Sequence, residues 1–166
     1  MIPSAEKITS VLLSEYDSLV ELVRLLKEEQ ICILQRQTEK LMAVLSNIEE
    51  QLVRVRQYQG EHEEVLKDLI PADVSPTQPG LTARVQLLPE NLREQPLAIA
   101  QKIDVQTLLV NEFAWQNHVL LSHSVHFLEQ VLAPWLDPHQ ESVSVYGQNG
   151  ALQKNTKRQA IFQATA

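Results

Sequence analysis

The feature that most constrains the fold is a heptad pattern of apolar residues between Leu41 and Leu69. The apolar positions alternate steps of three and four, with polar interruptions at Gln59 and His62. This spacing places the side chains on one face of an α-helix, because the helix has about 3.6 residues per turn. Gly60 lies inside the stretch and costs about 1 kcal/mol relative to alanine. We therefore expect a long helix that frays or bends at Gly60.

Two further stretches carry apolar stripes at helical spacing. The first runs from Ser4 to about Leu34 and contains no glycine or proline. The last runs from Gln95 or Pro96 to about Leu132. Proline suits the first turn of a helix and breaks its interior, so we expect Pro96 to open this helix and Pro134 to end it.

The breaks between the stripes differ in kind. Thr38 follows a short polar interruption and is a candidate N-cap for the second helix. Residues 71–96 hold five of the eight prolines, which forbid a continuous helix there. We expect a linker with one short helix around Leu81–Leu88.

Composition supports long helices. Only four glycines occur in 166 residues, and aromatic residues make up 5% against 44% hydrophobic residues. Folds with many tight turns need more glycine, and a core poor in aromatic residues must be aliphatic. We predict an all-α protein: an elongated antiparallel bundle of three long helices over residues 1–139, with a flexible C-terminal tail over residues 140–166.

Charge and cysteine content narrow the partners and the compartment. The net charge is −7, although the tail carries three cations against Glu141. An acidic body disfavours nucleic acid as a partner. A single cysteine excludes an internal disulfide, and no segment has the apolar run of a signal peptide or a membrane span. We expect a cytoplasmic protein without stable membrane insertion.

Histidines near the end of the third stripe are the only candidates for chemistry. His123, His126 and Glu129 recur at helical spacing, but a metal site needs three or more converging ligands. We therefore interpret these residues as ordinary polar positions of a helix. The competing hypothesis is a metal-dependent enzyme with His123 and His126 at its site. No glycine-rich phosphate loop or nucleophile–base arrangement is present. We expect neither an enzyme nor a cofactor.

Three further residues of the third stripe are ambiguous. We expect Trp115 and Trp135 to pack in the core or at its end, because large aromatic side chains usually bury their area. The alternative is an exposed anchor for a partner. Asn117 interrupts the stripe, and it either specifies helix register or faces solvent.

A short string in the tail, Val143 to Gly150, places Tyr146 between polar residues and two glycines. It has the character of a docking peptide, and composition alone leaves equal room for a chain end without a role. Leu152, Ile161 and Phe162 are further apolar points that could contact a partner after ordering.

Two strings together resemble a known family. Gln116-Asn117-His118-Val119-Leu120-Leu121 in the third helix and Tyr146-Gly147-x-x-Gly150 in the tail are similar to segments of the FlgN family of flagellar export chaperones. The likeness covers nearly the whole chain, including the helical stripes.

The resemblance implies a function in recognition. Such proteins bind hook–filament junction proteins in the cytoplasm through the clients' C-terminal helical segments, and deliver them to the type III export gate. It implies that Tyr146, Gly147 and Gly150 dock on the cytoplasmic domain of the gate protein. We expect the client to contact Asn117, Leu120, Leu121, Phe127, Leu128, Leu152, Ile161 and Phe162.

The alternative function is a coiled-coil adaptor that dimerises through the Leu41–Leu69 seam, with an inert tail. The expected oligomeric state of a chaperone of this kind is a monomer or a weak dimer.

Overall fold

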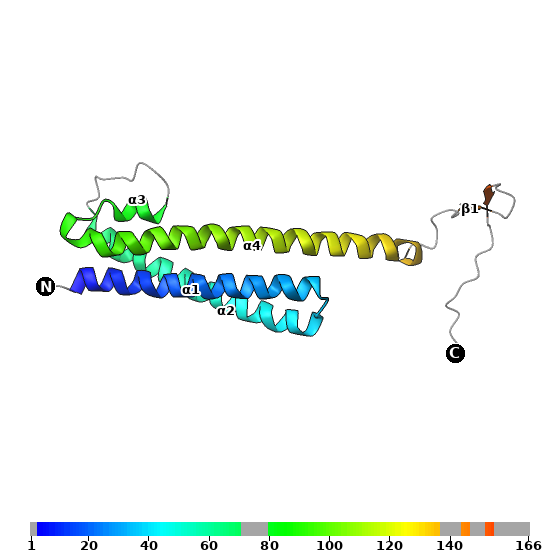
Figure 1. Ribbon diagram of the computed structural model, residues 1–166, viewed down its shortest axis with the longest axis horizontal. Helices are drawn as coiled ribbons and strands as arrows, with labels where there is room; N and C mark the ends of the chain where they lie inside the picture. Colours follow the sequence, from blue (N-terminus) through cyan, green and yellow to red (C-terminus); the bar gives the residue numbers. More distant parts are fainter. Residues whose placement is uncertain (1–2, 71–79, 137–143, 147–151, 155–166) are drawn as a thin grey trace. The chain divides into compact units, whose positions relative to one another are not determined.

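The computed structural model describes residues 3–70, 80–136, 144–146 and 152–154. The predicted helical body is confirmed, and four helices occupy the first two of these ranges (Figure 1). They are α1 (Pro3–Leu34), α2 (Thr38–Leu69), α3 (Leu81–Val85) and α4 (Glu90–Leu136).

A tight turn joins α1 to α2. Arg36 has a positive φ of 56°, the backbone N–H of Gln37 donates to the carbonyl of Cys32, and that of Arg36 donates to Ile33. These two hydrogen bonds and the positive φ form a helix C-terminal cap, in which Arg36 takes the position that glycine usually occupies. The prediction that Thr38 is the N-cap is wrong, because Gln37 holds that position and Thr38 is already helical. The side chain of Gln37 makes no capping hydrogen bond to the first turn of α2.

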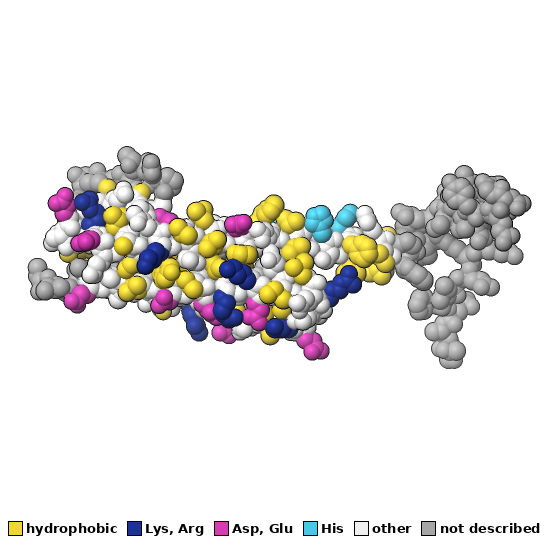
Figure 2. All heavy atoms as spheres, viewed as in Figure 1, with side chains coloured by type: hydrophobic (Ala, Val, Ile, Leu, Met, Phe, Trp, Pro, Cys, Tyr) yellow, Lys and Arg dark blue, Asp and Glu magenta, His cyan; other side chains and the backbone are white. Residues whose placement is uncertain are grey.

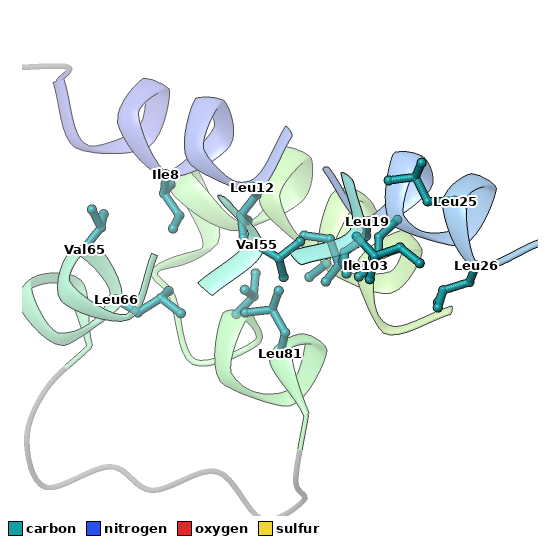
Figure 3. Close-up of a cluster of buried hydrophobic side chains, with 14 of the residues drawn as sticks. Ile8, Leu12, Leu19, Leu25, Leu26, Val55, Val65, Leu66, Leu81 and Ile103 are labelled. Carbon is teal, nitrogen blue, oxygen red and sulfur yellow. The ribbon is translucent and has the colours of Figure 1, made fainter. Parts of the chain in front are cut away.

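The core is aliphatic and is centred on α1. Leu12, Leu22 and Ile8 are among its fully buried side chains. Figure 3 shows Ile8 and Leu12 near Leu66 of α2 and Leu81 of α3, within one buried cluster that all four helices share. Burial of this apolar surface is the main favourable contribution to folding.

The heptad seam of α2 packs within the same chain. Ile48, Val55 and Leu66 of the seam are buried in the core cluster, whereas Gln59 is exposed. The helix does not fray at Gly60, because α2 continues from Thr38 to Leu69. Since α1 already covers the seam, it is a poor candidate for the dimer interface of a coiled-coil adaptor.

The short helix α3 begins on a contact with α4. The backbone N–H groups of Leu81 and Thr82 donate to the carboxylate of Asp104 at 3.3 and 3.1 Å. Gly80 precedes them with a φ of 126°, a conformation that favours glycine. Asp104 therefore supplies the cap that Gly80, which has no side chain, cannot.

The fourth helix is longer than the sequence predicts. It begins at Glu90, so Pro96 lies inside it, and it continues past Pro134 to Leu136. A proline lacks one N–H, and a long helix can continue around it at the cost of that bond. Of the predicted linker, residues 71–79 lie outside the described residues, and the remainder contains α3, a short connection and the start of α4.

Side-chain contacts show that α4 runs parallel to α1. The helix α2, which comes between them in the sequence, runs in the opposite direction (Figure 1). Lys102 lies over the ring of Tyr16, and Lys27 lies over the ring of Phe113. Further along both helices, Gln30 donates to Gln116 at 3.0 Å.

The chain divides into two compact units, Met1–His123 and Ser124–Ala166. The predicted tail, residues 140–166, contains two short strands among its described residues: β1 (Ser144–Tyr146) and β2 (Leu152–Lys154). They pair antiparallel. The predicted boundary between residues 139 and 140 lies outside the described residues.

Candidate protein-binding surfaces

Apolar side chains are exposed along much of α4. The exposed fraction is 68% for Leu108, 67% for Trp115, 60% for Phe127 and 55% for Leu128. The prediction that Trp115 is buried is therefore wrong, whereas the side chain of Trp135 lies outside the described set. Between Asp104 and Glu129 the only Asp, Glu, Lys or Arg is Glu112. Exposed apolar side chains with so few charges are typical of an interaction surface.

The last turns of α4 are amphipathic. Phe127, Leu128, Val131 and Leu132 recur at helical spacing and are exposed. We call these four residues the capture face. Figure 2 shows hydrophobic side chains gathered near this end of α4, next to the histidines.

The opposite side of the same turns is polar. The Nε2 of Gln130 lies 3.0 Å from the Nε2 of His126, and the Nδ1 of His126 lies 3.8 Å from the carboxylate of Glu129. These polar groups contact one another along one side of the helix and leave the apolar side free of charge.

Asn117 holds α4 to α1 instead of facing solvent. Its side chain is 2% exposed, and its Nδ2 donates to the carbonyl of Leu26 at 2.8 Å and to the carboxylate of Glu29 at 2.7 Å. Its Oδ1 is buried without a hydrogen-bond partner. In this conformation Asn117 fixes helix register, and the predicted contact with a client would require α4 to separate from α1 at this level.

The other predicted client residues differ in exposure. Leu120 and Leu121 are half-buried, and Phe127 and Leu128 belong to the capture face. Leu152 lies in β2, whereas Ile161 and Phe162 lie outside the described residues.

The predicted gate-docking tyrosine lies at the end of a strand. Tyr146 is the last residue of β1 and pairs with Leu152, the first residue of β2. Gly147 and Gly150, which we predicted to shape the turn, lie outside the described residues.

The histidines are not gathered into a metal site in the described part of the chain, where no group of three His, Cys, Asp or Glu residues could hold an ion. His123 and His126 are exposed on α4. That the protein is not an enzyme stays a prediction.

Sequence reasoning missed two buried carboxylates of α1. Glu15 lies 2.5 Å from the Nδ1 of His62 in α2, and both side chains are buried. Glu29 is buried beside Asn117. Their positions in the sequence could have revealed them. Each carboxylate, and each of its partners, occupies a position in an apolar stripe, so a polar residue in one stripe could have been matched with a polar residue in another.

No helix in the described part of the chain is long and apolar enough to cross a membrane. No curated protein and no solved structure matches the chain significantly. A family model does match: the model described as FlgN protein covers residues 1–154. With almost the entire chain matched, this protein belongs to the FlgN family, which implies a role as a flagellar export chaperone.

Proposed function

We propose that the protein binds hook–filament junction proteins in the cytoplasm and delivers them to the type III export gate. The observation that carries the proposal is the capture face of α4, in a chain that belongs to the FlgN family. Phe127, Leu128, Val131 and Leu132 offer apolar area that the described residues leave exposed.

The chemistry of the client explains why such a face suits the role. A helical segment that later packs in a filament junction has an unpaired apolar face before assembly, and that face favours premature association. A helix that offers its own apolar face can cover it, with anchors at helical spacing. The contact area of a few side chains keeps the affinity moderate, so the client can leave at the gate.

Tyr146 provides the proposed contact with the gate. It closes β1 at the end of a strand pair that belongs to a different unit from the bundle core. An aromatic ring supplies large contact area at low cost in side-chain entropy, which makes tyrosine a frequent anchor in protein interfaces. Gly147 and Gly150 would form the turn that presents it.

The client-binding proposal is tested by calorimetry with a peptide that spans the C-terminal helical segment of a hook–filament junction protein. We expect Phe127→Ser/Leu128→Ser to weaken binding at least tenfold, because truncated central anchors dominate such interfaces. The matched control is Met42→Ser/Val53→Ser, which removes two equally exposed apolar side chains from α2. Equal affinity of the two double variants would show that the capture face does not bind the client.

The gate-docking proposal has a separate test. We expect Tyr146→Ala to weaken binding to the purified cytoplasmic domain of the gate protein while leaving client affinity unchanged. Tyr146→Phe keeps the ring and should retain most of the affinity. An unchanged gate affinity in Tyr146→Ala would refute the docking role and leave the client-binding proposal intact.

A further inference from the structure

A second apolar surface of α4 lies within the Met1–His123 unit. Its positions alternate steps of three and four, which is the spacing of a helix–helix seam. Val105 is 55% exposed, Leu108 68% and Trp115 67%, while Val119 is half-buried. We call this surface the outer seam, and it comprises Val105, Leu108, Glu112, Trp115 and Val119.

The outer seam points away from the protein core. Ile103, Val110 and Asn117 are spaced by seven and mark the side of α4 that packs inward. The seam residues lie on the opposite side of the same turns. The seam residues are therefore exposed because they lie on the outer side of α4, and not because the core is loosely packed.

Glu112 occupies the middle of the outer seam, and its carboxylate is held in place. The side-chain amide of Gln30 in α1 donates to Gln116 at 3.0 Å, and the amide of Gln116 donates to Glu112 at 3.2 Å. This relay orients the only formal charge between Val105 and Leu128. An oriented carboxylate flanked by apolar side chains is suited to a single cationic group.

The central charge argues against a second copy of this chain as the occupant. In a parallel pair, equivalent seam positions face each other, so the two Glu112 carboxylates would repel. In an antiparallel pair, each Glu112 would face Leu108 or Trp115 of the other copy and lose its hydration without a partner. Both arrangements are unfavourable, and a helix with a cation at the facing position is favourable.

We propose that the outer seam binds an amphipathic helix of another protein that carries a lysine or arginine in the middle of its apolar stripe. The seam extends over two heptads, so the partner helix needs a stripe of the same length. Leu108 and Trp115 supply the apolar contacts, and Glu112 selects the cation.

This proposal stands independently of the capture face. The outer seam consists of different residues, and the variant Phe127→Ser/Leu128→Ser should leave it unchanged. Failure of client binding at the capture face would therefore not count against the outer seam, and the reverse also holds.

The test uses two synthetic two-heptad helical peptides that differ only in one central seam position, lysine in one and glutamate in the other. In a Trp135→Phe background, Trp115 is the only tryptophan and reports binding by its fluorescence. We expect the lysine peptide to shift the emission to shorter wavelength and to bind about tenfold more tightly than the glutamate peptide. Glu112→Lys should invert this preference.

The control variant is Glu49→Lys, which makes the same charge change at an exposed position of α2 and should not alter the preference. Equal affinity for both peptides, or the same inversion in Glu49→Lys, would overturn the proposal. A dimer in sedimentation that Trp115→Ser abolishes would assign the seam to a second copy instead. The fluorescence of Trp115 could also become more sensitive to an added quencher when residues 155–166 are removed. That result would assign the outer seam to the chain's own end and would overturn the proposal.

Discussion

At the scale of single residues, polar groups buried between helices determine how α1 meets its neighbours. Glu15 pairs with His62 of α2, and Glu29 pairs with Asn117 of α4. A buried polar group is tolerated only where a partner satisfies it, so each pair permits one register and penalises others. Apolar packing between stripes is much less selective for register.

The Asn117 contact should be measurable as stability. Asn117→Ala removes two hydrogen bonds and deprives the buried Glu29 carboxylate of a donor. We expect the free energy of unfolding in urea to fall by about 1–3 kcal/mol. Asn111→Ala, at an exposed position of the same helix, should change it by less than about 0.5 kcal/mol. Equal effects of the two substitutions would contradict the assigned role of Asn117.

A surface cluster on α1 gives a prediction about pH. The hydrogen bond from Arg24 holds the pKa of Glu21 below its ordinary value, and the same bond raises the pKa of Arg24. The folded-state pKa of Glu21 is thus lower than the unfolded one. Its contribution to stability is complete above the unfolded pKa and is lost as the pH falls through the folded pKa.

This contribution is small, because the two side chains remain 57% and 43% exposed and solvent screens the pair. The direct measurement is an NMR titration of the Glu21 carboxyl carbon. We expect Arg24→Gln to raise the pKa of Glu21 toward the ordinary glutamate value. The same pKa in both proteins would show that Arg24 is not the cause.

At the scale of elements, the sequence predicts the helices well and their exposure poorly. Periodicity locates α1 and α2 almost to the residue, because amphipathic spacing and the polar break before Thr38 are local signals. The ends of α4 that we predicted from Pro96 and Pro134 are wrong, because whether a helix tolerates an internal proline depends on tertiary packing. The local sequence also does not determine which apolar stripe is buried by another helix. Trp115 and Phe127 continue apolar patterns and are nevertheless exposed.

Gly60 offers a test at this scale. It lies inside the continuous helix α2, and a Cβ added there would meet no atom within 4 Å. We expect Gly60→Ala to stabilise the protein by about 0.5–1 kcal/mol, because alanine loses less backbone entropy in a helix. Chemical denaturation followed by circular dichroism measures the change. A destabilised variant would indicate a bend or a close contact at residue 60.

At the scale of the whole molecule, α2 and α4 differ in what their apolar residues do. Those of α2 mainly form the core, whereas many of those of α4 are exposed. α1 uses both neighbours to form the core, and it leaves α4 with apolar residues that have no partner in the described part of the chain. The sequence alone could name Phe127 and Leu128 as client contacts only through resemblance to a family. Their exposure supplies the physical reason for that expectation.

Amide hydrogen exchange of the full chain, with and without the C-terminal helical segment of a hook–filament junction protein, tests the central claim most directly. The last turns of a helix exchange quickly unless a partner covers them. We predict that the client slows exchange chiefly in the segment of α4 that carries Phe127 to Leu132. Protection confined to α1 and α2, with exchange in that segment unchanged, would contradict the account.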